Sequence, residues 1–149
     1  MSEQNKQLAF VFPGQGSQSV AMLTEMAEAY PEVEATFSQA SEVLGFDLWK
    51  LVNEGPVEEL NQTHNTQPAM LAAGVALWRV WCAQSEVRPA YMAGHSLGEY
   101  TALVCSGVLG FADAISLVAA RGRCMQEAVP EGVGAMAAIL GLADEQVIQ

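Results

Sequence analysis

Short unbroken apolar runs alternate with longer stretches of helical periodicity along this chain. Residues 8–12 and 90–93 are runs without a charged side chain, and the first ends at Pro13. Such runs are typical of strands that are buried on both faces of a parallel sheet. Residues 135–140 form a similar run and predict a further strand. Strands separated by helical stretches predict an α/β fold with a parallel sheet.

The longer stretches place apolar residues at the spacing of a helix face, and several carry start or stop signals. Ser17 or Ser19 is expected to cap the first helix and Thr66 a strongly apolar one farther along, while Gly45 is a typical C-terminal stop. The expected helices are residues 17–29, 32–44, 69–84, 99–108 and 114–128, with shorter helical turns at 56–60 and 143–146.

The distribution of these elements predicts two unequal parts. Residues 1–130 are expected to form the N-terminal part of a large subdomain, and residues 131–149 the start of a small one. The boundary falls in segment 130–134, which contains proline and glycine. Two clear strands are few for about five helices. We therefore interpret the sequence as the front part of a larger protein, with exposed apolar surface that favours association.

Composition and net charge exclude several classes of partner and of site. A hydrophobic fraction of 51% over 149 residues is sufficient for a packed core. Six basic against seventeen acidic residues give a net charge of −11, which excludes nucleic acid and anionic membrane surfaces as general partners. The three cysteines fit neither a disulfide framework nor a zinc site, and Cys105 is expected to be a core thiol. With no signal-peptide or transmembrane pattern, the sequence predicts a cytoplasmic protein.

The clearest candidate chemistry is the pentapeptide G-H-S-L-G at residues 94–98, which follows the second predicted strand and precedes a predicted helix. A serine on a tight strand-to-helix turn has the setting of a nucleophile elbow. Ser96 is therefore the candidate nucleophile, and the backbone N–H of Leu97 is a candidate oxyanion donor. The alternative is a glycine-rich turn with an incidental serine.

A second glycine-containing loop, G-Q-G-S-Q at residues 14–18, follows the first predicted strand. It is not a dinucleotide-binding fingerprint, because Ser19 stands where the third glycine is required, and it lacks the lysine of a phosphate-binding loop. Two interpretations stay open: a plain strand-to-helix turn, or a loop whose N–H groups face the active edge of the sheet. In the second, the Gln15 backbone is the other oxyanion donor.

Arg121 is a candidate anion-binding residue, because it is one of only six basic residues and stands in an otherwise apolar helix. Its planar guanidinium suits a carboxylate held through two hydrogen bonds. An arginine on such a face also commonly extends to solvent or pairs with an acidic side chain. His95 is expected to pack within the fold and His64 to lie on the surface, so neither is assigned as the general base for Ser96.

Four motifs together resemble the malonyl-CoA:acyl carrier protein transacylases of bacterial fatty acid synthesis, over essentially the whole chain. They are F-P-G-Q-G-S-Q at 12–18, N-T-Q-P-A at 65–69, G-H-S-L-G-E-Y at 94–100, and R-G at 121–122 followed by M-Q at 125–126. The resemblance implies an α/β-hydrolase-like large subdomain and a ferredoxin-like small one. It implies that Ser96 carries the acyl group and that the amides of Gln15 and Leu97 form the oxyanion hole. Arg121 would hold the malonyl carboxylate, with Gln67 near the same pocket.

The implied reaction passes a malonyl group from coenzyme A to serine and then to the phosphopantetheine thiol of acyl carrier protein. Both thioesters are substrates, so the resemblance implies no separate cofactor and no metal. Family members are much longer than this chain and carry their catalytic histidine in the second half, so we expect little or no transacylase activity from this chain alone. The alternatives are an α/β serine hydrolase and an inactive fragment that only binds a partner.

Overall fold

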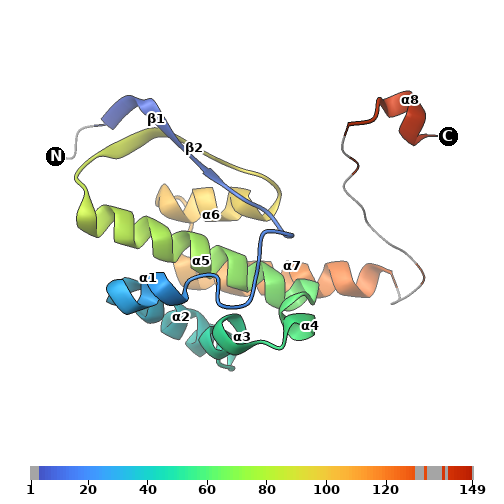
Figure 1. Cartoon of the computed structure of the whole chain (residues 1–149), viewed down its shortest axis with the longest axis horizontal. Helices are drawn as coiled ribbons and strands as arrows, with labels where there is room; N and C mark the ends of the chain where they lie inside the picture. The colour runs from blue at the N-terminus through green and yellow to red at the C-terminus, as the bar shows by residue number, and fades with distance from the viewer. Residues whose placement is uncertain (1–3, 130–132, 134–138, 140, 149) are drawn as a thin grey trace.

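The computed structural model describes residues 4–129, 133, 139 and 141–148 of the chain. It confirms the predicted α/β class, with a two-stranded parallel sheet that has helices packed on one side (Figure 1). The strands are β1 (Gln4–Phe12) and β2 (Arg88–Gly94). The helices are α1 (Thr24–Ala29), α2 (Pro31–Leu44), α3 (Leu48–Glu54), α4 (Val57–Leu60), α5 (Thr63–Gln84), α6 (Leu97–Cys105), α7 (Phe111–Ala128) and α8 (Asp144–Val147).

The two strands end at the same edge of the sheet, because Phe12 of β1 lies opposite Gly94 of β2. On the inner face, Phe10 packs edge-on against the indole rings of α5. On the outer face, Val11 is 75% exposed and Tyr91 68% exposed. The apolar surface expected from the sequence is therefore present on the outer face of the sheet, while association through it stays a prediction.

The long helix α5 lies at the centre of the helical layer, in contact with α2, α6 and α7 (Figure 1). Its side chains are buried on several sides rather than along one stripe, which is why its sequence is apolar almost all round. Within the described part of the chain, no helix is long and apolar enough to cross a membrane.

The starts of α1 and α5 differ from the sequence prediction. Helix α1 begins at Thr24 rather than near Ser17 or Ser19, because Gly16 (φ 105°) and Ala21 (φ 62°) adopt left-handed backbone that interrupts a helical path. The predicted stop of α2 is confirmed, since Gly45 adopts a left-handed conformation with φ 77°.

Thr66 is not the N-cap of α5, because the helix already begins at Thr63. Its hydroxyl instead donates to the carbonyl of Leu60 at 2.6 Å and so ties α5 to the end of α4. Helix α3 was not predicted, although its start signal is present: the Asp47 carboxylate accepts from the Lys50 N–H at 2.8 Å.

Two further predictions fall largely outside the described residues. The strand expected at residues 135–140 is described only at Ile139, and most of the boundary segment 130–134 is also outside the described part. The division into two subdomains therefore stays a prediction. Helix α8 covers much of the predicted turn at 143–146.

Cys105 lies in the core at the end of α6, as predicted, with 9% of its surface exposed. Burial raises the pKa of this thiol to about 12; the neighbouring Cys82 adds to the shift and Arg79 opposes it. We expect Cys105 in the folded chain to react with iodoacetamide at pH 8 about a thousandfold more slowly than an unperturbed thiol, because so little thiolate is present. Timed labelling and mass spectrometry measure the rate, with the exposed Cys124 as internal comparison.

The same shift gives a pH dependence of stability. Between about pH 8.5 and 12 the folded chain keeps the Cys105 proton that the unfolded chain has lost, so the free energy of unfolding should fall as pH rises through this range. In denaturant the labelling rates of Cys105 and Cys124 should converge. Equal rates in native buffer would contradict the buried position of Cys105.

Candidate active site

Ser96 lies in the turn between β2 and α6, at the carboxyl edge of the sheet. Its backbone adopts φ 53° and ψ −103°, a conformation that costs a residue with a side chain about 1–3 kcal/mol. A hydrogen bond from the Gly98 N–H to the His95 carbonyl, at 2.9 Å, closes the turn. Ser96 itself is exposed. The backbone thus has the form of a nucleophile elbow, while the chemical role of Ser96 stays a prediction.

Two glycines make this turn possible because the surrounding backbone leaves no room for a side chain. A Cβ atom on Gly94 would overlap the carbonyl group of Gly98, and one on Gly98 would overlap the carbonyl oxygen of Phe12. Both contacts involve backbone atoms, so no side-chain rotation relieves them. The glycines therefore let the end of β1, the end of β2 and the start of α6 meet at one point.

The loop after β1 lies against the elbow. The His95 N–H donates to the Phe12 carbonyl at 3.2 Å, which joins the two strand ends. Gln15 follows three residues after Phe12 and is exposed. The first N–H groups of a helix have no partner within the helix, so the Leu97 amide at the start of α6 is available to a ligand. The two predicted oxyanion donors therefore belong to adjoining loops at one edge of the sheet.

The Gln15 loop is held by side chains from the first residue of α5 and from the turn before that helix. The Gln15 side-chain amide donates to the Thr63 hydroxyl at 3.2 Å, and the Gln18 side-chain amide donates to Asn61 Oδ1 at 2.8 Å. The Gly16 N–H donates in turn to Gln18 Oε1 at 2.8 Å. The first two contacts tie the loop to the start of α5 and to the turn before it.

Arg121 extends from α7 to the elbow, as the sequence prediction requires. Its Nη2 donates to Ser96 Oγ at 3.1 Å, and its Nη1 donates to Gln67 Oε1 at 2.8 Å. The guanidinium carbon also lies 5.6 Å from the centre of the Tyr100 ring, close enough for a favourable cation–π contact. Within the described part of the chain, no carboxylate forms a salt bridge with Arg121. The cation is therefore available to an anionic ligand, in a chain whose net charge is −11.

Gln67 is fully buried, with none of its surface exposed. Its Oε1 accepts from Arg121, and its Nε2 donates to the sulfur of Met125 at 3.1 Å. It therefore lies beside the candidate site, as predicted. Its direct contact is with the guanidinium, so a role in binding substrate stays a prediction.

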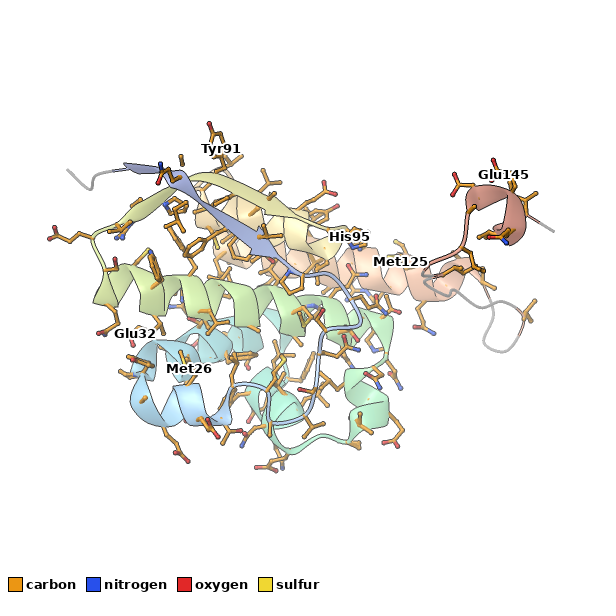
Figure 2. The ribbon with its side chains drawn as sticks, turned by 45° about the horizontal axis from the view of Figure 1, so that its top comes forward. Met26, Glu32, Tyr91, His95, Met125 and Glu145 are labelled. Carbon is orange, nitrogen blue, oxygen red and sulfur yellow. The ribbon has the colours of Figure 1, made fainter. Side chains whose placement is uncertain are left out.

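The two histidines are not placed as partners of Ser96. His95 is exposed rather than packed within the fold, so this part of the sequence prediction is wrong. Figure 2 shows it at the carboxyl end of β2, where its carbonyl oxygen and its Nδ1 lie close to Gly14 and leave little room for a side chain there. His64 is half-buried, and its backbone packs against Gly122. Among the described residues, neither imidazole hydrogen-bonds to the Ser96 hydroxyl.

Sequence reasoning assigned no role to three residues of this cluster, Thr63, Tyr100 and Met125, although the last two stand within the motifs that carry the family resemblance. Tyr100 lies in the first turn of α6, four residues after Ser96, and Met125 follows Arg121 by four residues, one turn along α7. That spacing is the signal that could have identified them. Thr63 carries no such signal, because it is 48 residues from Gln15 in the sequence.

The arrangement places an exposed hydroxyl, two backbone amides and a guanidinium without a carboxylate partner among the described residues at one edge of the sheet. These groups suit attack on a carbonyl carbon, because the amides can stabilise the charge that develops on the carbonyl oxygen. The described residues contain no cluster of three or more histidine, cysteine or acidic side chains that could hold a metal ion.

Comparisons with known proteins agree with this geometry. Residues 9–148 match the family described as an acyl transferase domain. The chain is 66% identical over 141 residues to the malonyl CoA-acyl carrier protein transacylase of Salmonella typhimurium, a match that covers 95% of this chain and 46% of that protein. It is 62% identical over 144 residues to the protein of the same name from Haemophilus influenzae, with 96% and 46% covered.

Solved structures give the same result. The crystal structure of malonyl-CoA:acyl carrier protein transacylase from Xanthomonas oryzae superimposes with a TM-score of 0.93 at 59% identity, covering 97% of this chain and 46% of that one. A malonyl-transacylase in complex with a type II PKS acyl-carrier protein gives a TM-score of 0.82 at 64% identity, covering 83% and 40%. The chain thus spans about half the length of the relatives it matches. Because the family match extends over nearly its whole length, the chain belongs to the acyl transferase domain family.

Proposed function

We propose that this chain carries the acyl-accepting part of a malonyl-CoA:acyl carrier protein transacylase of fatty acid synthesis, with an α/β-hydrolase-like large subdomain. The observation that carries the proposal is the 3.1 Å hydrogen bond from Arg121 Nη2 to Ser96 Oγ. A simple serine hydrolase has no need of a cation beside its nucleophile, whereas a malonyl thioester ends in a carboxylate. The names of the similar proteins support the same activity.

In the first half-reaction, Ser96 Oγ attacks the thioester carbonyl carbon of malonyl-CoA. A C–O bond forms, the C–S bond breaks, the hydroxyl proton passes to a base, and coenzyme A leaves as its thiol after taking up a proton. The carbonyl oxygen becomes anionic in the intermediate and accepts hydrogen bonds from the backbone amides of Gln15 and Leu97. Arg121 exchanges its bond to Ser96 for bonds to the malonyl carboxylate, and so holds the acyl group in place.

In the second half-reaction, the phosphopantetheine thiol of acyl carrier protein attacks the ester carbonyl carbon of malonyl-Ser96. A C–S bond forms, the C–O bond to Ser96 breaks, and the thiol proton passes through a base to Ser96 Oγ, so that malonyl-acyl carrier protein and the free hydroxyl result. Both thioesters are substrates, so the proposal includes no separate cofactor. The proposed setting is the cytoplasm, and the proposed macromolecular partner is acyl carrier protein. The complex of a similar transacylase with an acyl-carrier protein supports this partner.

We expect prolonged incubation with malonyl-CoA to place one malonyl group on Ser96, and Ser96→Ala to prevent it. No described residue hydrogen-bonds to Ser96 as a base, so acylation should be slow and turnover far below that of a full-length relative. Added imidazole should accelerate the reaction, since it supplies a base from solution. Intact-mass and peptide mass spectrometry measure the extent and the position of acylation.

Cys124→Ser is the matched control, because Cys124 is an exposed thiol that offers another acyl acceptor. Its adduct yield should equal that of the unchanged chain. An adduct that survives in Ser96→Ala and disappears in Cys124→Ser would show that the wrong nucleophile had been assigned. Rapid hydrolysis with many turnovers would instead indicate a serine hydrolase, and no adduct at high imidazole would leave only a binding role.

A further inference from the structure

The buried amide of Gln67 joins two side chains of α7. Its Oε1 accepts from Arg121 Nη1 at 2.8 Å, and its Nε2 donates to Met125 Sδ at 3.1 Å. Arg121 and Met125 are one helical turn apart, so both meet the same amide from one face of α7. The three side chains form a chain of contacts that ends at Ser96 Oγ.

The chemistry of the amide gives each contact a direction. A guanidinium carries only donors, so it must meet the oxygen of Gln67 and not the nitrogen. That orientation turns the amide nitrogen away from Arg121 and toward Met125. Because Gln67 is fully buried, this nitrogen has no access to water and needs a protein acceptor. The thioether sulfur is a weak acceptor, but it is the partner that the structure provides.

Removal of that acceptor would change which orientation of the Gln67 amide is favoured. With an apolar side chain at position 125, the amide nitrogen would be buried without a partner, which favours rotation of the amide away from its present orientation. A rotated amide presents its nitrogen to the guanidinium, and two donors then face each other. Arg121 would lose the contact that fixes its Nη1 and, with it, the placement of its Nη2 beside Ser96.

We propose that Met125 is a positioning residue for acyl-group selection: its sulfur holds the Gln67 amide in the orientation that aims Arg121 at the acyl group on Ser96. The selection part of this proposal rests on the proposed function, while the positioning part does not. Met125 touches neither Ser96 nor the reacting atoms in the contacts described above, so it acts through Gln67 and Arg121.

The test compares two substitutions at one position. Met125→Leu keeps an apolar side chain of similar size and removes the acceptor, whereas Met125→Gln supplies a carbonyl oxygen on a side chain of similar length. Met26→Leu is the matched control, because Met26 is also half-buried and lies on α1, away from Met125 on α7 (Figure 2). All variants are made in the full 149-residue chain.

Two readouts are measured. The first is hydrogen exchange of the Gln67 side-chain amide in ¹⁵N-labelled protein, assigned by its absence in Gln67→Leu. We expect exchange about tenfold faster in Met125→Leu and nearly unchanged in Met125→Gln and Met26→Leu. The second is the ratio of the Kd of acetyl-CoA to that of malonyl-CoA by calorimetry. We expect this ratio to fall about tenfold in Met125→Leu and to recover in Met125→Gln.

The outcomes separate the two proposals. Unchanged exchange and an unchanged ratio in Met125→Leu would overturn the positioning role, and so would equal losses in the Leu and Gln variants, since these would reflect packing alone. If the unchanged chain shows no preference for malonyl-CoA while the Gln67 amide still responds as expected, the positioning contact stands and the proposed substrate is wrong.

Discussion

We expect Gly94→Ala to lower the free energy of unfolding by about 4 kcal/mol or more, which is in the range of the most damaging single substitutions. An alanine Cβ at this position would overlap the backbone carbonyl of Gly98. Gly94 has an ordinary φ, so the cost does not arise from its own conformation. It arises because β2 and α6 would have to separate, and that separation would also displace Ser96 from the Phe12 end of β1.

Thermal unfolding followed by circular dichroism measures this effect, and the midpoint should fall by about 10 °C or more. Gly110→Ala is the matched control. There a Cβ would lie 3.0 Å from Asp113 Oδ2, the movable end of a side chain, so the loss should stay below about 1 kcal/mol. Equal midpoints for the two variants would mean that the elbow has room for a side chain and that its close backbone contacts are absent.

The parts of this fold that the sequence predicts are those fixed by neighbours in the chain. An unbroken apolar run predicts β1, and Gly45 predicts the end of α2 because only a few residue types adopt its left-handed backbone. The elbow belongs to the same class, since the two glycines, the serine and the flanking elements lie within a few residues of one another. For this reason Ser96 could be proposed as the nucleophile before its φ of 53° was seen.

The parts that the sequence could not predict depend on residues far apart in the chain. The hydrogen bond between Arg121 and Gln67 joins residues 54 positions apart. Gln67 was proposed only because the N-T-Q-P-A motif resembles the transacylase family, and not from any local pattern. The start of α1 is set by the positive φ of Ala21, which is rare for alanine and has no local signature. The prediction that Thr66 caps α5 was wrong for a related reason. Its hydroxyl donates to the carbonyl of Leu60 in α4 and does not cap the start of a helix.

We expect Arg121→Ala to weaken malonyl-CoA binding and Ser96 malonylation about a hundredfold or more, and to change the corresponding acetyl-CoA values by less than about threefold. Only the malonyl group ends in a carboxylate, so only malonyl loses charge-assisted hydrogen bonds when the guanidinium is removed. Arg121→Lys should give an intermediate loss, because an ammonium group keeps the charge but not the planar pair of donors. Calorimetry and timed mass spectrometry with the two thioesters measure both quantities.

Arg123→Ala is the control that separates a local effect from a general one. It removes the same charge two positions along α7, from an exposed side chain. If the cation acted only by reducing the net charge of −11 that repels an anionic thioester, both alanine variants would weaken malonyl-CoA and acetyl-CoA alike. If Arg121 binds the carboxylate, only Arg121→Ala will abolish the difference between the two thioesters. Equal losses of malonyl and acetyl transfer in Arg121→Ala would assign the residue to folding or to the placement of Ser96. The acetyl group has no carboxylate, so the loss of a carboxylate contact cannot slow its transfer.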